Sequence, residues 1–160
     1  MGAGEQQDRI MVRNLRAEDL EQVVAVDAKN GGKRRDEYFR VKLAQNLAET
    51  GVKVSLASEL DGCFVGFLLA RVYYGEFGAP EPVAVLDTFA VHPEFGRRGI
   101  GSALLDQLCK NLNGLGVRSL HTEVSWDDPA LLAFFHGQGF HPASRFCLDL
   151  DLDDRAAVRE

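Results

Sequence analysis

The chain has 160 residues, of which 46% are hydrophobic and 26% are charged. This size is typical of one domain that buries its core without disulfides or a structural metal, and the composition excludes a disordered tail or a fibrous repeat. The 24 acidic and 18 basic residues give a net charge of −6. A negative chain repels a phosphate backbone, so generic nucleic-acid binding is disfavoured.

The sequence contains no apolar run long enough for a membrane span. The longest candidate, Cys63 to Ala70, has only the length of a strand. Residues 1–9 are small and polar, so we expect a leader without fixed structure, followed by a domain over 10–153 and a polar tail over 154–160. Without a membrane span or a secretory signal, we expect a cytoplasmic protein. Three scattered cysteines without C-x-x-C spacing predict reduced, buried thiols.

The first elements in chain order are a short strand and two helices. A strand is expected at Val12–Leu15, and apolar residues at helical spacing then predict a helix from Leu20 to Ala28 that stops at the Asn30-Gly31-Gly32 sequence. A second helix is expected over 38–48, closed by Thr50-Gly51. We interpret the basic run 33–35 between them as a solvated loop, with a partner or substrate contact as the alternative.

Three strands follow. Residues 52–57 and 64–74 flank Asp61-Gly62, which is typical of a β-hairpin turn. Residues 75–82 hold two glycines and two prolines and form a loop. Val83–Val91 is a third, strongly apolar strand that ends at His92-Pro93.

The last third of the chain alternates helix and strand. The spacing predicts a helix over 101–113, a strand over 117–124, and a helix from Pro129 to His136 with Asp128 as its N-cap. Alternating apolar residues predict a final strand over 145–152. We therefore expect a mixed α/β fold with helices on both faces of a central sheet.

One segment is a candidate binding site. It joins the strand ending at Val91 to the next helix through a turn that contains glycines and arginines. Such a turn exposes backbone N–H groups at the positive end of a helix, which suits an anion. The spacing excludes a Walker P-loop, since no lysine follows Gly101, and it lacks the third glycine of a dinucleotide fingerprint.

These residues resemble the GNAT (Gcn5-related) N-acetyltransferases. In that family a strand ending A-V-x-P leads to R/Q-x-x-G-x-G/A, which is similar to Phe89-Ala90-Val91-His92-Pro93 and Arg98-Gly99-Ile100-Gly101. The segment Ala133-Phe134-Phe135-His136-Gly137-Gln138-Gly139-Phe140 resembles the family's F-Y-x-x-x-G-F. The resemblance extends over about 11–152 and implies a mostly antiparallel sheet that splays between two strands, the acyl-CoA N-acyltransferase fold.

The resemblance further implies acetyl-CoA as co-substrate and no metal. Its pantetheine arm would pair with the backbone of the Val83–Val91 strand, and its pyrophosphate would lie on the amides of the glycine-rich turn. The cofactor-binding residues implied are Phe89, Ala90, Val91, Gly96, Arg97, Arg98, Gly99, Ile100, Gly101, Ser102, Asp128 and Phe135.

The chain departs from the family pattern at two positions. Gly96 stands at the leading Arg/Gln position, although Arg97 and Arg98 keep positive charge nearby. Phe135 stands where the family has a tyrosine taken as the general acid, and a phenyl ring donates no proton. For Asp128, an N-cap role is the alternative to a cofactor contact.

Asp87 is the candidate general base, because it is a carboxylate within an otherwise apolar strand. The alternative is that it bonds a neighbouring loop or faces water. Glu76, in the loop over 75–82, and Glu123 are weaker candidates for meeting a cationic amine. The four histidines show no metal-ligand spacing.

The function expected is direct transfer of acetyl from acetyl-CoA to a primary amine in a ternary complex, since no cysteine lies in the motif to carry the acyl group. The alternative is a non-catalytic acyl-CoA-binding or sensing domain. The acceptor is a small molecule, a peptide N-terminus or a lysine; nucleic acid and membrane partners are not expected. A homodimer is possible through the edge strand expected over 145–152.

Overall fold

The computed structural model describes residues 9–48 and 53–158, which fall into two compact units divided after Glu123. The leader expected at 1–9, apart from Arg9, and the helix stop at Thr50-Gly51 lie outside the described residues. Within the described ranges, no helix is both long and apolar enough to cross a membrane.

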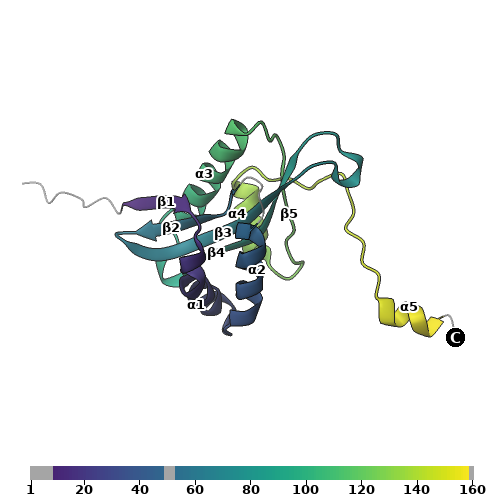
Figure 1. The fold of residues 1–160 in the computed structure, drawn as a ribbon, viewed down its shortest axis with the longest axis horizontal. Coiled ribbons are helices and arrows are strands. Elements are labelled where there is room, and N and C mark those ends of the chain that lie inside the picture. The colour runs from purple at the N-terminus through teal and green to yellow at the C-terminus, as the bar shows by residue number, and fades with distance from the viewer. Residues whose placement is uncertain (1–8, 49–52, 159–160) are drawn as a thin grey trace, which may run out of the picture. The chain divides into compact units, whose positions relative to one another are not determined.

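The first unit is built on one five-stranded sheet in the order β1-β2-β3-β4-β5 (Figure 1). The first four strands pair antiparallel and β5 runs parallel to β4, which confirms the mixed, mostly antiparallel sheet. The strands are β1 (Ile10–Asn14), β2 (Leu56–Leu60), β3 (Cys63–Tyr73), β4 (Val83–Val91) and β5 (Leu120–Thr122). The β2–β3 turn has positive φ at both Asp61 and Gly62, as its sequence predicts.

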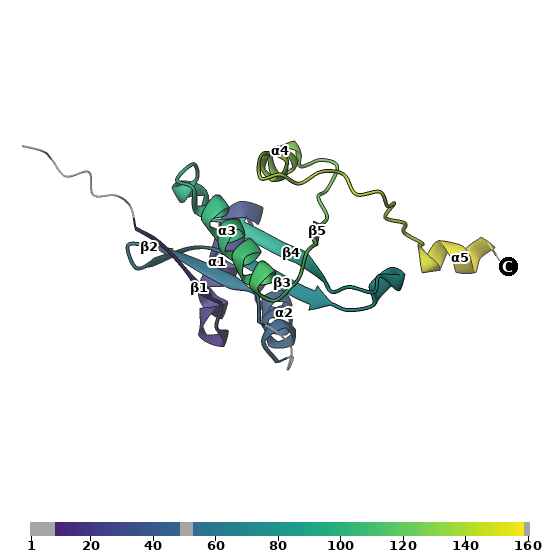
Figure 2. The same ribbon diagram turned by 90° about the horizontal axis from the view of Figure 1, so that it is seen from above.

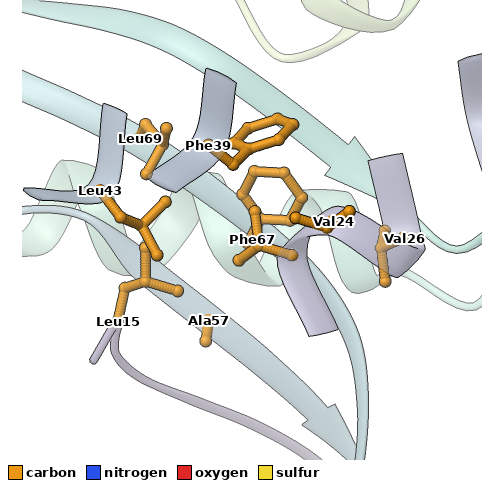
Figure 3. Packing of buried hydrophobic residues seen from close by; sticks show 9 residues of the cluster. Leu15, Val24, Val26, Phe39, Leu43, Ala57, Phe67 and Leu69 are labelled. Atoms are coloured by element: carbon orange, nitrogen blue, oxygen red, sulfur yellow. The ribbon is translucent and has the colours of Figure 1, made fainter. Parts of the chain in front are cut away.

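Helices cover both faces of this sheet. Figures 1 and 2 show α1 (Leu20–Gly31) and α2 (Asp36–Ala48) on one face and α3 (Ile100–Gly114) on the other. On the first face, Figure 3 shows Phe39 of α2 against Phe67 of β3, with ring centroids 5.8 Å apart, beside Val24. On the other face, α3 buries the predicted stripe of Ile100, Leu104, Leu108 and Leu112.

The basic run after α1 is held by ion pairs. Arg34 pairs with Glu21 and Asp36, and Arg35 pairs with Asp27 and stacks over the ring of Tyr38, with its guanidinium carbon 4.7 Å from the ring centroid. These contacts connect α1 to α2, so the two arginines serve the fold of this corner.

The second unit contains α4 (Pro129–Gly137) and α5 (Leu152–Val158). The Asp128 carboxylate accepts a hydrogen bond from the N–H of Leu131, so its N-cap role is confirmed. Phe135 of α4 is buried, with its ring centroid 4.9 Å from that of Phe140.

The prediction of a final strand over 145–152 is wrong. Residues 140–151 form neither helix nor strand, α5 begins at Leu152, and Phe146 and Leu148 are exposed. Alternation determines which side chains share a face, but a strand also needs a neighbour for its backbone groups. The helical turns of α5 extend into the segment that we expected to be a tail.

The cysteines also differ from expectation. They remain thiols, but Cys63, Cys109 and Cys147 are all exposed rather than buried. Partial burial, together with the charge of Asp106, raises the pKa of the Cys109 thiol.

A buried carboxylate fastens the start of α1 to the sheet. Both oxygens of Asp19 accept hydrogen bonds of 2.8 Å from the Arg13 guanidinium of β1, and Oδ2 also accepts from the N–H of Arg16. Burial alone would raise the pKa of Asp19, but the hydrogen bonds from Arg13 and Arg16 outweigh it and lower that pKa. Arg13 also donates to Glu59 of β2.

We predict that Asp19→Asn lowers the free energy of unfolding at pH 7 by about 2–3 kcal/mol, because it leaves the partly buried Arg13 cation without its main partner. A lowered carboxyl pKa stabilises the fold above the unfolded-state pKa and loses that effect as the pH falls, so the difference from wild type should shrink below about pH 4. Urea denaturation across pH measures both effects. Glu18→Gln, at the exposed neighbouring carboxylate, is the control; a constant difference at all pH values would contradict the prediction.

Candidate functional site

A β-bulge in β4 positions Asp87. Leu69 of β3 is opposite Thr88, whereas the next residue, Ala70, is opposite Leu86, so Asp87 is the extra residue in β4. Thr88 shares the sheet face of Leu69, which belongs to the core under α1 and α2. The bulge therefore displays Asp87 from the middle of an otherwise apolar strand.

The Asp87 carboxylate is not surrounded by water alone, because its Oδ2 forms an ion pair with the ammonium of Lys42 in α2. The two side chains are 28% and 21% exposed, so the pair is partly shielded but reachable from solvent. Asp87 is therefore not isolated in apolar surroundings, contrary to the prediction from its strand sequence. Lys42, whose sequence position gives no sign of this contact, lies beside it.

The sheet opens immediately beyond the bulge. β5 pairs with β4 only at Ala84, Val85 and Leu86, and the Thr122 hydroxyl donates to the Leu86 carbonyl at 2.9 Å where this pairing ends. β4 continues to Val91. The splay between these two strands that the family resemblance implies is present at this point.

The backbone of β4 faces this opening at alternate residues. The backbone N–H of His92 donates to the carbonyl of Val65 in β3. Because successive residues of a strand direct their backbone groups to opposite sides, the N–H and carbonyl groups of Phe89 and Val91 point away from β3. They face the side on which β5 has ended. The Val91 carbonyl accepts a 3.0 Å hydrogen bond from the side-chain amide of Asn30, at the end of α1. Asn30 is a site neighbour that its helix-stop sequence did not reveal.

A tight turn carries the chain from β4 into α3. It passes through a short 3-10 turn, Pro93–Phe95, and then through Arg97 and Gly99, both with positive φ, at +65° and +79°. α3 begins at Ile100 without a side-chain cap and without an acidic residue in its first turn. An uncapped, acid-free helix start keeps the positive end of the helix dipole available to an anion, which is the feature that the sequence predicts here.

Two aromatic contacts order this turn. The guanidinium of Arg98 lies over the Phe95 ring, with its central carbon 5.5 Å from the centroid, and His92 packs edge-on against the same ring. The ring Nδ1 of His92 accepts a hydrogen bond from the N–H of Glu94. Positive charge is thereby kept at the start of α3, although Gly96 offers no side chain.

The structure brings most of the predicted cofactor residues together. Phe89 to Val91 form the open end of β4, and 96–102 form the last part of the turn and the first residues of α3. Asp128 and Phe135 belong to the second unit. Glu76 lies in the β3–β4 loop, at the opposite end of β4 from the turn, and Glu123 follows β5 directly. Among the described residues, no three His, Cys, Asp or Glu side chains gather as a metal site.

Comparisons with known proteins agree with this architecture. The ribosomal protein bS18-alanine N-acetyltransferase of Escherichia coli (strain K12) is 30% identical over 117 residues, which are 73% of this chain but only 62% of that protein. The L-2,4-diaminobutyric acid acetyltransferase of Nocardia farcinica (strain IFM 10152) is 36% identical over 81 residues, 51% of this chain and 40% of that protein.

Solved structures confirm the fold. The aminoglycoside N-acetyltransferase AAC(6')-Iy, in complex with CoA, superposes with a TM-score of 0.77 at 18% identity, covering 92% of this chain and 98% of that one. Residues 12–140 match the family described as the acetyltransferase (GNAT) family. The chain therefore belongs to the GNAT acetyltransferase family.

Proposed function

We propose that this protein transfers the acetyl group of acetyl-CoA to a primary amine. The observation that carries the proposal is the uncapped, acid-free start of α3, placed directly after the open end of β4. The start of α3 would attract the pyrophosphate of CoA, and the part of β4 beyond its pairing with β5 would suit the pantetheine arm. CoA is the molecule bound in the AAC(6')-Iy structure.

The cofactor would bind through backbone groups more than through side chains. The pyrophosphate would accept hydrogen bonds from amides between Arg97 and Ser102, with the arginines adding positive charge. The amides of pantetheine would pair with Phe89 and Val91, as an added strand pairs with a sheet edge. The Asn30 amide, which donates to the Val91 carbonyl, would then share that acceptor or leave it.

The chemistry proposed is direct attack. The amine nitrogen adds to the thioester carbonyl carbon, the carbon–sulfur bond breaks, the CoA thiolate leaves and the amine loses its surplus proton to Asp87. No cysteine lies between Val83 and Ser102 to carry the acetyl group, which supports a ternary complex. Phe135 supplies no acid, so the thiolate would leave without a proton from that position.

The Asp128 carboxylate already caps α4, which favours its structural role over a cofactor contact. Phe135 remains a proposed cofactor residue, and within its own unit its buried ring packs against Phe140. Exposed thiols at Cys63 and Cys109 suit a reducing compartment, so the cytoplasm remains the proposed location.

The exposed apolar side chains from Phe146 to Leu152 support association with a second copy. Sedimentation of the whole protein over a range of concentrations tests this proposal. A monomer at every concentration would exclude it.

The general test is release of CoA thiol from acetyl-CoA in the presence of a panel of amines: spermidine, an aminoglycoside, an amino acid and an alanine-initiated peptide. Thiol release that requires an amine supports transfer. Tight acetyl-CoA binding with no amine-dependent release would instead support the binding or sensing domain.

We predict that Gly99→Asp weakens CoA binding about tenfold or more, whereas Gly99→Asn changes it only about twofold. Both residues tolerate the left-handed backbone at position 99, and they differ by one negative charge at the anion site. Isothermal titration calorimetry measures the two affinities. Equal CoA affinities in the two folded variants would show that the pyrophosphate does not bind at this turn.

We predict that Asp87→Asn lowers kcat by about 10²-fold, because the amide keeps the shape of the carboxylate but accepts no proton. CoA affinity should stay near that of wild type. Glu81→Gln, at an exposed carboxylate before β4, is the matched control and should leave kcat unchanged. If Asp87→Asn turns over at the wild-type rate, the amine loses its proton to solvent and Asp87 is structural.

A further inference from the structure

The Lys42–Asp87 ion pair has a consequence for the acceptor. If Asp87 receives the proton of the acceptor amine, the amine must approach a carboxylate that an internal ammonium already occupies. An acceptor ammonium arriving there meets one charge that attracts it and one that repels it. The Lys42–Asp87 pair itself is therefore neutral, despite the net charge of −6 for the whole chain.

The groups around the pair add further donors. Asn46 follows Lys42 by one helical turn and shares its side of α2. Both the nitrogen and the oxygen of its side-chain amide are buried, and neither has a hydrogen-bond partner in the described part of the chain. Arg71 of β3 lies on the sheet face of Leu69, which packs under α2. Two cations, one uncommitted amide and one carboxylate thus share this face.

This combination of charges discriminates between classes of amine. A purely cationic acceptor would have to separate Lys42 from Asp87 and leave two ammonium groups facing each other. An acceptor that carries a carboxylate exchanges one ion pair for two, because its amine meets Asp87 and its carboxylate meets Lys42. The unbonded Asn46 amide gives such a polar acceptor a donor and an acceptor nearby.

We propose that the acceptor is an amine bearing a carboxylate, an amino-acid-like zwitterion, and that Lys42 is the residue that selects it. The proposal rests on the proposed function, since it requires acetyl transfer with Asp87 at the amine. It distinguishes this site from one built for polycationic sugars or for the amine end of a long peptide, which carries no carboxylate beside its nitrogen.

The test compares two acceptors of nearly the same shape, L-2,4-diaminobutyrate and L-2,4-diaminobutyramide, by kcat/KM for thiol release. Wild type should prefer the carboxylate about tenfold or more, the effect of one well-placed charge-assisted contact. In Lys42→Met the preference should fall to about twofold or less, because the partner of the carboxylate is gone. Lys110→Met, on the exposed side of α3, is the matched control and should keep the preference.

A second variant separates selection from folding. Lys42→Arg keeps the cation and should keep most of the preference, and thermal unfolding shows whether either variant loses stability. A wild type that prefers the amide, or a Lys42→Met variant that keeps the wild-type preference, would overturn the proposal.

The remaining outcomes separate this proposal from the proposed function. Turnover of spermidine or the peptide without turnover of either diaminobutyrate compound would overturn the acceptor proposal and leave acetyl transfer standing. Tight acetyl-CoA binding with no release for any amine would overturn both.

Discussion

The arrangement of the site depends on one extra residue in β4. Side chains and backbone groups along a strand alternate with a period of two, and the bulge at Asp87 shifts that alternation by one. Before it, the N–H of Ala84 and the carbonyl of Leu86 bond to β5. After it, Phe89 and Val91 present their backbone groups to the same side, where β5 has ended. The irregularity therefore displays a carboxylate at the point where the pairing with β5 ends.

The two faces of the sheet supply different parts of the chemistry. The α3 face provides a helix start with no acidic residue, which makes a local region of positive potential in a chain of net charge −6. The α1–α2 face provides Lys42 and Asn30, which reach β4 on either side of the open segment. In the proposed enzyme, the phosphate end of the donor would therefore meet one layer of the fold, and the acceptor would meet the other.

The features that sequence predicted are those set by local pattern. The bounds of β4 follow from an apolar run closed by Pro93, and α3 follows from its stripe of four residues. The Asp87 bulge is a matter of register between β3 and β4, which no single strand encodes. Lys42 is one charge on an ordinary helix until the fold brings it to Asp87. The segment over 145–152 shows the converse, since a clear alternating pattern there forms no strand.

The bulge also constrains how β4 can vary in length. Removing Asp87 would make Leu86 and Thr88 consecutive partners of Ala70 and Leu69, so Phe89 and Val91 would keep their present register and direction against β3. The five strands and the open edge would survive, but the displayed carboxylate would not. Insertions or deletions are therefore tolerable in the loop over 75–82, where the chain is exposed, whereas in β4 the loss of the one extra residue would remove the carboxylate while the rest of the strand kept its pairing.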